Sequence, residues 1–570
     1  MKLNFAGSRL LATRTSRAGL VWALLLGSVL AQTPSADLPA PAALPSFTEL
    51  QAAGATIGTI RILAQDIFDL DDPREDKLLF RWANKFHIQT RPWVIERALL
   101  FKRGEPLSVR RLEETERLLR SNRYLYDVQF RVVAVNDGVV DIDVITRDTW
   151  SLEPGASVGR AGGANSSGVH LTEHNLFGTG ISLSLGHSKN VDRSSNEFQF
   201  LNDRAFSAFG RWTSLAFSHA SNSDGKRSAV LLTQPFYALD TRWAAGLTAV
   251  KDERIDAVYR AGNITSQYRH QQQLGEAFAG WSAGLVEGWV QRYSLGLNVH
   301  DDVYSNAPGL AAATRLPVDE KRVGPFLRYA LIEDHFDREL NRNLIGRPEF
   351  FALGLAAHVQ LGWASTGLGS SLNALLFSGT LSKGFEPQPD QTLIVSGSAS
   401  GQVAGSEVRR QRLGAQAKFY LRHNPRWLFY ASAAADVQGR VDPAEQLLLG
   451  GDNGLRGYPL RYQSGTRRAL FTAEERFYTD LYIWRLFRLG GAAFVDVGRA
   501  WGGTNFNATS ATSATNPVNP PWLGNAGLGL RIVSARSAFS NVLHVDIAFP
   551  LNASAEIKKT QLLVKTRASF

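Results

Sequence analysis

One arginine stands out among the residues of this chain that could do chemistry. Arg456 lies between glycines in the segment 449–459, and an aromatic residue follows shortly after it. A guanidinium is a rigid, always charged fork that forms two parallel hydrogen bonds with a carboxylate in a dry site. Gly454 and Gly457 allow positive φ angles and close approach of the backbone. The segment predicts a sharply turned loop tip; the alternative is a surface hairpin whose arginine faces solvent.

Motifs of the common enzymes are missing. The chain has no His-Glu-x-x-His zinc pattern, no Gly-x-Ser-x-Gly elbow and no phosphate loop. Its 11 histidines are scattered, and it has no cysteine for disulfides or thiolate metal sites. We therefore expect no enzyme, no metal, no cofactor and no nucleotide. An acidic pair on external loops, as in barrels that are proteases or lipases, is the alternative.

The charge balance argues against nucleic acid as a partner. The chain of 570 residues has 62 Lys and Arg against 52 Asp and Glu. Four of the cations, Lys2, Arg9, Arg14 and Arg17, lie within residues 1–31, which contain no acid. The remaining excess is spread over a long chain, whereas nucleic-acid-binding proteins gather basic residues on one face.

The amino terminus is typical of secreted proteins. A basic stretch precedes the apolar run 18–30, which is too short to span a bilayer comfortably, and small side chains precede a cleavage point at Gln32. We interpret residues 1–31 as a signal peptide; an uncleaved anchor helix is the alternative. Residues 32–54 are rich in Ala and Pro and predict a flexible linker.

Residues 55–149 predict a small α/β domain. A strand over 57–70 is followed by a helix over 91–101, with Thr90 as its cap, and by a second helix capped by Ser108. Two alternating strands then meet at the tight turn 136–138, which reads Asn-Asp-Gly.

From residue 150 onward the helical periodicity disappears. Short segments such as 181–186, 527–532, 543–549 and 562–570 alternate apolar residues with small or charged ones. In a soluble sandwich the apolar face would meet another sheet; in a membrane barrel it would meet lipid. We favour a transmembrane antiparallel β-barrel because no helices are available to cover that face, and because lipid tolerates only a closed sheet. With about 9–11 residues per spanning strand, the length suits roughly 14 to 18 strands.

Together these segments resemble the BamA/TamA superfamily of outer-membrane barrels, of the surface-antigen type with a single amino-terminal polypeptide-transport-associated (POTRA) domain. The resemblance rests on segments 449–459, 494–498 and 174–180 and on the terminal Phe570. It implies a mainly β chain with a barrel of about 16 strands over 150–570. Segments 94–101 and 147–150 also resemble a POTRA domain, which it places over 55–149.

The resemblance assigns roles to the loop tip and to the barrel wall. In this superfamily an Arg-Gly-aromatic tip folds back into the barrel and meets an acidic residue on the inner wall. The lumen-loop motif would be Leu455, Arg456, Gly457 and Tyr458. Its inner-wall partners would be Phe494, Asp496, Gly498 and Glu474. Asp496 is the expected acceptor for Arg456, and Glu474 is a second candidate on the neighbouring strand.

The expected function is that of an outer-membrane polypeptide translocase or insertase in a Gram-negative bacterium, with the POTRA domain in the periplasm. Unfolded or nascent polypeptide clients would add as a strand to the edge between Tyr126 and Val133. The residues expected at this docking edge are Val128, Phe130 and Val132. The barrel seam would lie between residues 150–159 and the last strand.

The same interpretation implies further binding partners and leaves alternative functions open. The wall would contact the lipid bilayer, and Phe570 would be read by the outer-membrane assembly machinery. Neither nucleic acid nor nucleotide is expected as a partner. The alternatives are a two-partner-type secretion transporter for one dedicated client and a passive structural or pore-forming barrel.

Overall fold

The computed structural model describes residues 44–203, 212–313, 316–503, 520–534 and 542–567. The expected signal peptide, most of the expected linker and Phe570 lie outside these residues. Residues Pro45–Phe570 form one compact unit. Within the described ranges, no helix has the length and apolar character needed to cross a membrane.

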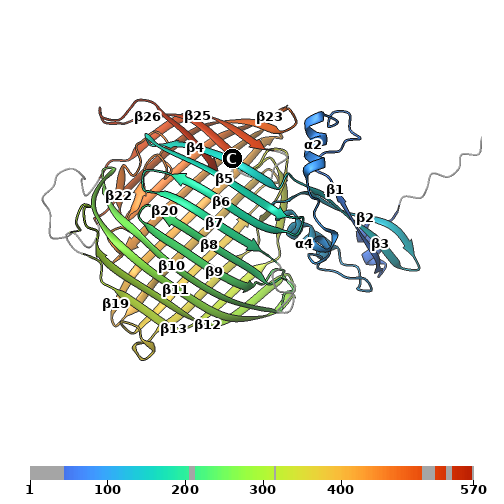
Figure 1. Ribbon diagram of the computed structural model, residues 1–570, viewed down its shortest axis with the longest axis horizontal. Coiled ribbons are helices and arrows are strands. Elements are labelled where there is room, and N and C mark those ends of the chain that lie inside the picture. Colours follow the sequence, from blue (N-terminus) through green and yellow to red (C-terminus); the bar gives the residue numbers. More distant parts are fainter. Residues whose placement is uncertain (1–43, 204–211, 314–315, 504–519, 535–541, 568–570) are drawn as a thin grey trace, which may run out of the picture. The chain divides into compact units, whose positions relative to one another are not determined.

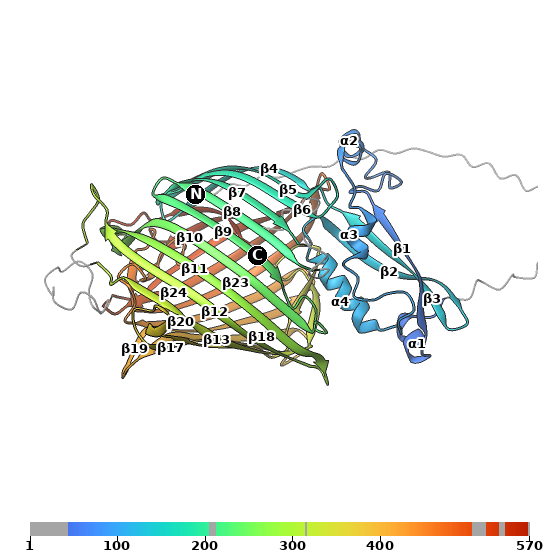
Figure 2. The same ribbon diagram turned by 60° about the horizontal axis from the view of Figure 1, so that its bottom comes forward.

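The amino-terminal part is a three-stranded sheet with helices against it. β1 (Thr56–Gln65) pairs in parallel with β3 (Val139–Asp148), and β3 pairs antiparallel with β2 (Leu125–Asn136). The sheet order is therefore β1-β3-β2, which leaves β2 at an edge. The helices of this part are α1 (Phe47–Ala52), α2 (Leu78–Phe86), α3 (Pro92–Glu96) and α4 (Val109–Arg120). Figure 2 shows α3 and α4 beside the three strands.

A buried apolar cluster holds this part together. It joins the sheet to α3 and α4 through side chains such as Ile95, Leu119 and Ile142, which are fully buried. Burial of each such side chain stabilises the fold by about 1.5–3 kcal/mol. Leu50 and Phe47 of α1 belong to the same cluster or pack against it. The linker expected over 32–54 therefore ends earlier than predicted, because residues 47–52 form a helix.

The helices differ from the sequence prediction in two respects. The helix predicted over 91–101 is only the five residues of α3, and Thr90 does not cap it. Thr90 instead donates to Asp148 through both its backbone N–H (2.7 Å) and its hydroxyl (2.9 Å). α2 was not predicted, and its N-cap Lys77 makes no side-chain capping bond that would signal a start. The predicted cap at Ser108 is confirmed: its hydroxyl accepts from the N–H of Arg111.

The barrel is a closed ring of 20 antiparallel strands (Figure 1). Its first ten strands are β4 (Leu152–Ala161), β5 (Ala164–Leu176), β6 (Ile181–Lys189), β7 (Ser194–Asn202), β8 (Ser214–Asn222), β9 (Gly225–Gln234), β10 (Trp243–Arg260), β11 (Asn263–Val286), β12 (Trp289–Asn306) and β13 (Glu320–Glu333). The other ten are β16 (Ala356–Ala364), β17 (Ala374–Phe385), β18 (Gln391–Ala404), β19 (Glu407–Asn424), β20 (Trp427–Gly439), β23 (Arg467–Ile483), β24 (Phe487–Trp501), β25 (Leu523–Ser534), β26 (Val542–Pro550) and β27 (Gln561–Arg567).

The prediction of about 16 strands is wrong. That number came from the family resemblance, and the length alone suited roughly 14 to 18 strands. Some strands of the ring are short and leave room for others: β6, β7 and β8 have 9 residues each. Nine residues are about the minimum for a tilted spanning strand, so the same length yields more of them.

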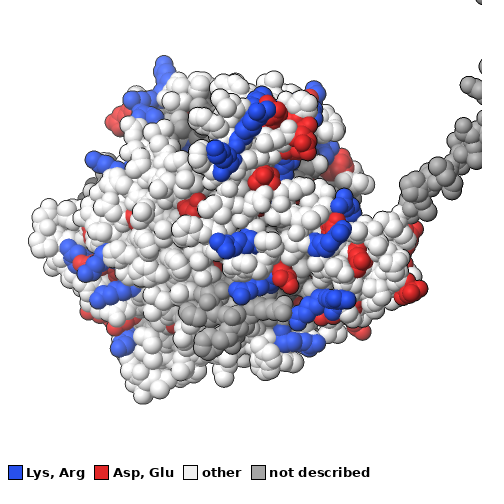
Figure 3. Space-filling model, turned by 45° about the vertical axis from the view of Figure 1, so that its right-hand side comes forward, with Lys and Arg blue, Asp and Glu red and all other residues white. Residues whose placement is uncertain are grey.

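The outer face of the wall is apolar. Leu247, Leu295 and Leu528 are exposed and point away from the bore. Exposed tryptophans lie at strand ends, among them Trp243, Trp289 and Trp427. Such aromatic girdles mark the membrane interfaces of outer-membrane barrels. On the face drawn in Figure 3, charged side chains form small groups of both signs on a mostly uncharged surface.

Two connections between strands are long and carry strands of their own. Loop 440–466 joins β20 to β23 and contains β21 (Leu447–Leu449) and β22 (Gln463–Gly465). Segment 334–355 joins β13 to β16 and contains the hairpin of β14 (Phe336–Leu340) and β15 (Pro348–Ala352). Because neighbouring strands alternate in direction, the two connections start from opposite ends of the barrel. A 3₁₀ turn, η1 (Thr366–Leu368), lies between β16 and β17.

Candidate functional site

The tip of loop 440–466 brings Arg456 against the inner wall. Its Nε donates to Asp496 Oδ2 and its terminal nitrogen to Asp496 Oδ1, both at 2.8 Å. The guanidinium carbon lies 3.3 Å from the centre of the Phe494 ring. Both charged side chains are buried, Arg456 at 2% exposure and Asp496 at 0%. This is the bidentate geometry in which Arg and a carboxylate bind most strongly.

Asp496 has two further donors that the sequence did not single out. Asn525 donates to its Oδ2 at 2.8 Å and Thr472 donates to its Oδ1 at 3.0 Å. They come from β25 and β23, the strands on either side of β24, which carries Asp496. A buried carboxylate is stable only when its oxygens are satisfied, so these two strands hold the acceptor ready for Arg456.

Other charges surround this pair and form what we call the buried ion cluster. Its members are Arg456, Glu474, Arg476, Asp496, Arg531 and Asp546, which are all buried. Glu474 Oε1 lies 3.7 Å from Arg456, so Glu474 is a neighbour of Arg456 rather than its main acceptor. Arg531 pairs with Asp546, and Asp546 also lies 3.6 Å from Arg456. Three arginines and three acids alternate, so the cluster as a whole is balanced.

The rest of the tip packs closely into the wall. Tyr458 and Leu455 are fully buried, and the Tyr458 hydroxyl lies 3.0 Å from the carbonyl oxygen of Gly524. A Cβ on Gly457 would lie 2.6 Å from Cβ of Asn525, so only glycine fits there. A Cβ on Gly498 would meet three atoms of the loop and of β23 at 3.1 Å. The lumen-loop motif and its inner-wall partners therefore come together in one place.

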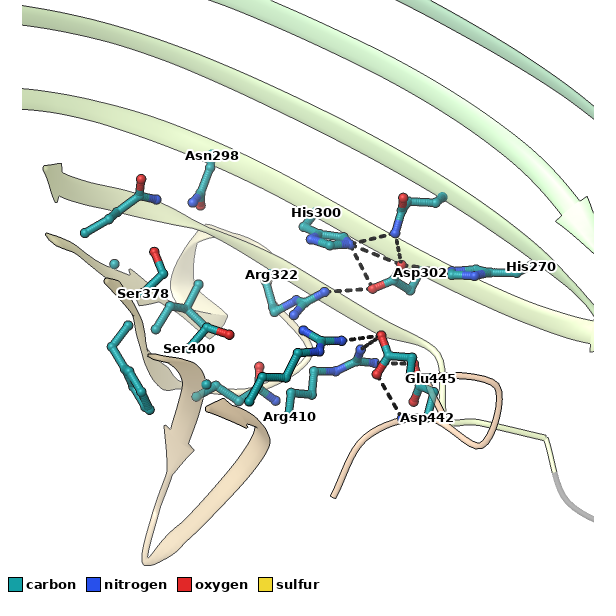
Figure 4. Close-up of a pocket in the computed structure, with 18 of the residues that line it drawn as sticks. His270, Asn298, His300, Asp302, Arg322, Ser378, Ser400, Arg410, Asp442 and Glu445 are labelled. Carbon is teal, nitrogen blue, oxygen red and sulfur yellow. Dashed lines mark hydrogen bonds and ion pairs between the residues drawn. The ribbon is translucent and has the colours of Figure 1, made fainter. Parts of the chain in front are cut away.

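The base of the loop is held at a second place that the sequence reading missed. A polar cavity of about 250 Å³ lies there, lined by strands of the wall and by the loop (Figure 4). The Tyr304 hydroxyl donates to Asp442 of the loop at 2.7 Å, and Arg410 lies 3.0 Å from the same carboxylate. Arg412 donates to Glu445 of the loop at 2.5 Å. Tyrosines and arginines spaced along strands carry no distinctive motif, so only the closed barrel reveals them as partners.

The turn at 174–180 joins the barrel to the amino-terminal sheet. The side-chain amide nitrogen of Asn175 donates to the Thr90 hydroxyl at 2.8 Å, and the side-chain oxygen Oδ1 of Asn175 accepts from the N–H of Gly180. Thr90 in turn donates to Asp148, which also lies 2.9 Å from His87. The turn 174–180 and the segment 147–150 both carry the family resemblance. In the structure they meet through Thr90.

The expected docking edge differs from its prediction in side-chain orientation. The side chain of Val128 is 1% exposed, and Phe130 and Val132 pack against the same core. The exposed side chains of this stretch are Gln129 and Arg131. The carbonyl oxygen of Val128 also accepts from Arg120 at 2.9 Å. β2 is at the edge of its sheet, but its apolar residues face inward.

The ring closes where the last strand meets the first. Among the described residues, the register between β27 and β4 is the single pair Val564 and Arg160. β4 and β5, by contrast, pair along their whole length from Leu152 to Ala161. The carboxyl-terminal Phe570 lies outside the described residues.

Within the described part of the chain, no group of three or more His, Cys, Asp or Glu side chains is placed to hold a metal ion. The charged groups of the lumen instead pair with one another. Their arrangement can hold or release a loop.

The comparison with protein families agrees with the barrel. The family model described as "Omp85 superfamily domain" matches residues 175–564. No curated protein matches the chain. Among solved structures, BamA from Haemophilus ducreyi lacking POTRA domains 1–3 is similar at 13% identity and a TM-score of 0.39, over 90% of this chain and 85% of that one. CdiB from Escherichia coli is similar at 13% identity and a TM-score of 0.44, over 89% and 76%.

Proposed function

This chain belongs to the Omp85 superfamily of Gram-negative outer-membrane barrels, and we propose that it moves polypeptides into or across the outer membrane as a translocase or insertase. The observation that carries the proposal is the closure between β27 and β4. The described residues provide one register pair there. A closure with a short register opens at low cost, and its edges can then pair with a client strand through N–H and C=O groups.

Contacts of the loop with both sides of this closure support the proposal. The N–H of Leu460 donates to the carbonyl oxygen of Gly162, directly after β4, at 3.2 Å. Lys565 of β27 donates to the carbonyl oxygen of Asp452 at 3.3 Å. Release of the Arg456 tip would therefore loosen the seam from inside, and an intact Arg456–Asp496 pair would keep it shut.

The amino-terminal sheet would be a POTRA domain in the periplasm that receives the client. The order β1-β3-β2, with β2 at the edge, supports this role. Unfolded polypeptide would add alongside β2 through main-chain hydrogen bonds, which demand little of its sequence. The exposed Gln129 and Arg131 flank that edge and would contact the incoming strand.

Site-specific photo-crosslinking in living cells tests the proposal. Photoreactive residues would replace Gln129 and Arg131 at the sheet edge and Val158, which is 73% exposed on β4 beside the seam. The matched controls are Trp82 on α2 and Leu295 on β12, which are as exposed but lie on other surfaces. Trapped chains would be identified by mass spectrometry.

Three outcomes are distinguished. Nascent barrel proteins trapped at both the edge and the seam, and not at the controls, are expected for an insertase. One secreted protein trapped at the edge alone would favour the two-partner-type transporter. Capture of no polypeptide at either place would overturn polypeptide transport in favour of a passive barrel.

A further inference from the structure

Segment 334–355 crosses the bore of the barrel. It starts from β13 and returns into β16, which are neighbours in the wall. Yet its tip residue Ile345 is 3% exposed and packs in one cluster with Tyr420 of β19, Tyr478 of β23 and Val542 of β26. In the ring, β16 and β26 are separated by β17, β18, β19, β20, β23, β24 and β25. A tip that lies in one apolar cluster with residues of β19, β23 and β26 therefore spans the opening rather than following the wall.

Specific contacts between side chains of the wall and Arg342 hold the hairpin tip in place. Arg342 is fully buried, and its guanidinium carbon lies 4.1 Å from the ring centres of both Tyr420 and Phe351. The backbone carbonyl of Arg342 accepts from Arg476 at 3.1 Å and from the Tyr478 hydroxyl at 3.0 Å. Cation–π contacts are strongest where the arginine is removed from water, as Arg342 is here.

Hydrogen bonds within the hairpin also fix the conformation of its turn. The Glu349 carboxylate accepts from the backbone N–H groups of Asn343 and Leu344, both at 2.9 Å. The N–H of Gly346 donates to the side-chain oxygen of Asn341 at 2.6 Å. Asn341 and Gly346 both have positive φ angles. The tip is therefore preorganised, and it can leave its seat as one piece.

The hairpin tip and the Arg456 tip share two residues of β23. Glu474 Oε1 lies 3.7 Å from Arg456 and 3.9 Å from Arg476. Arg476 then donates to the carbonyl of Arg342 in the hairpin tip. Because residues 474 and 476 are two apart on a strand, both face the bore. The chain of contacts from Arg456 to Arg342 thus runs along one side of one strand.

We propose that the hairpin 336–352 is an inner gate of the barrel, seated against β19 and β23 within an apolar cluster that reaches β26, and coupled to the Arg456 loop through Glu474 and Arg476. The two inserts enter from opposite ends, so the bore has two closures in series. Loss of either contact unbalances the shared pair, which lowers the cost of moving the other closure. The gate restricts any solute, so its test needs no client and is independent of the proposed function.

Single-channel conductance of the full chain in planar bilayers tests the gate. In one variant a short Gly-Ser turn replaces residues 341–347, and in another Ile345→Asp places a charge in the apolar seat. The control is Leu340→Asp on the same hairpin, where the side chain is 53% exposed. Heat-modifiable migration on gels verifies that each barrel is folded. We expect a severalfold rise in conductance for both tip variants and none for the control.

The coupling is tested with Arg456→Ala. Arg456→Ala alone should raise conductance by less than the hairpin variants do, because it loosens the hairpin only through Glu474 and Arg476. Combined with Ile345→Asp, it should raise conductance by more than the two single changes together. Folded tip variants that conduct like the unaltered protein would overturn the gate, and strictly additive conductances would overturn the coupling.

A second measurement does not depend on how the variants fold. The chain has no cysteine, so Ile345→Cys and Val533→Cys introduce its only thiols, and both positions line one small cavity. After folding, a short bis-thiol crosslinker should join them and abolish the opening events of the Arg456→Ala protein. Opening that persists in fully crosslinked protein would contradict an inner gate.

Discussion

The two inserts that enter the barrel are held by different physics. The Arg456 tip rests on charge: one guanidinium, a carboxylate at 2.8 Å and a surrounding buried ion cluster. The hairpin tip rests on apolar burial of Ile345, on aromatic faces around Arg342 and on backbone acceptors. Both lie against the same face of β23, the Arg456 tip beside Glu474 and the hairpin tip at Arg476.

The difference shows where each closure can fail. Buried charges are costly to remove from water and are stable only when each has a partner of opposite charge. Loss of one member therefore leaves the other buried charges without a partner. Apolar contacts are many and individually small, so the hairpin loses its seat gradually. The Arg456 tip, which we call the latch, is therefore suited to release in one step. The hairpin is suited to a gate that a ligand or an incoming chain can displace gradually.

Removal of the charge at the latch should have the largest effect. Arg456→Ala leaves Asp496 without its main partner and should destabilise the barrel by about 3–5 kcal/mol, the usual cost of breaking a buried pair. The urea midpoint of barrel unfolding in vesicles measures it. Arg467→Ala, an exposed arginine on the same strand β23, is the control and should stay within about 0.5 kcal/mol.

The double variant decides whether the latch is a pair. Arg456→Ala with Asp496→Ala should cost less than the two single changes added together, because neither charge is then left alone. It should not return to the unaltered value, since Asn525 and Thr472 also lose their acceptor. Fully additive effects would rule out the contact as an energetic unit.

Truncation of the buried side chain at the hairpin tip should have the next largest effect on stability. Ile345→Ala removes buried methyl groups, and such changes cost about 2–5 kcal/mol in well-packed sites. The cost should appear as faster amide hydrogen exchange over residues 341–347, while the wall strands keep their protection. Leu340→Ala is the control on the exposed side of the hairpin, and equal exchange in both variants would count against a packed seat.

Crowding of the charged tip should have a smaller effect. Gly457→Ala would place a Cβ 2.6 Å from Asn525 and 3.1 Å from the nitrogen of Pro550. Overpacking of this kind costs about 1–3 kcal/mol. Gly367→Ala serves as control, because its Cβ would meet only Ser365 at 3.6 Å. Unchanged urea midpoints in both proteins would mean that the tip does not sit closely on β25.

An ion pair outside the membrane whose arginines are exposed to solvent should contribute least to stability. Asp143 bridges Arg61 and Arg131, each at 2.8 Å, and both arginines are more than half exposed. Burial raises the pKa of Asp143, but hydrogen bonds from Arg131 and Arg61 outweigh this and leave its pKa below the usual 3.8. Asp143→Asn should cost about 1 kcal/mol at neutral pH, as expected for partly solvated pairs.

The pH dependence gives the sign of that contribution. A lowered carboxyl pKa stabilises the fold fully above the ordinary pKa, and the stabilisation is lost as pH falls below it. Urea midpoints for protease resistance of the amino-terminal sheet in the full chain should therefore fall between pH 7 and pH 3. The fall should be smaller in Asp143→Asn, and an identical fall in both proteins would remove Asp143 from the explanation.

Much of the wall could be predicted from the sequence. Alternation of apolar and polar residues along 543–549 and 562–567 reflects two faces of one strand, which is a local property. The strand number could not be predicted, because it depends on how strands of 7 to 24 residues share one closed ring. Thr90 shows the same limit at small scale: its residue type fits a helix cap, but Asp148, far along the chain, binds it instead.

The candidate site divides in the same way. Arg456 was recognised because glycines and an aromatic residue at fixed spacing shape a tip, and its acceptor Asp496 followed from the family resemblance. Asn525, Arg531 and Asp546 were missed. On their strands they look like any other polar residue that faces a wet bore, and only closure of the ring brings them within reach of the loop.

What the sequence alone determined is local: the strand periodicity of the barrel, the turned tip around Arg456 and the edge-forming hairpin of the small sheet. The tertiary structure decided the ring of 20 strands, the balanced ion cluster and the hairpin 336–352 across the bore. The reason is distance along the chain. Periodicity and turns act between near neighbours, whereas a latch and a gate each need a wall that exists only once the last strand has met the first.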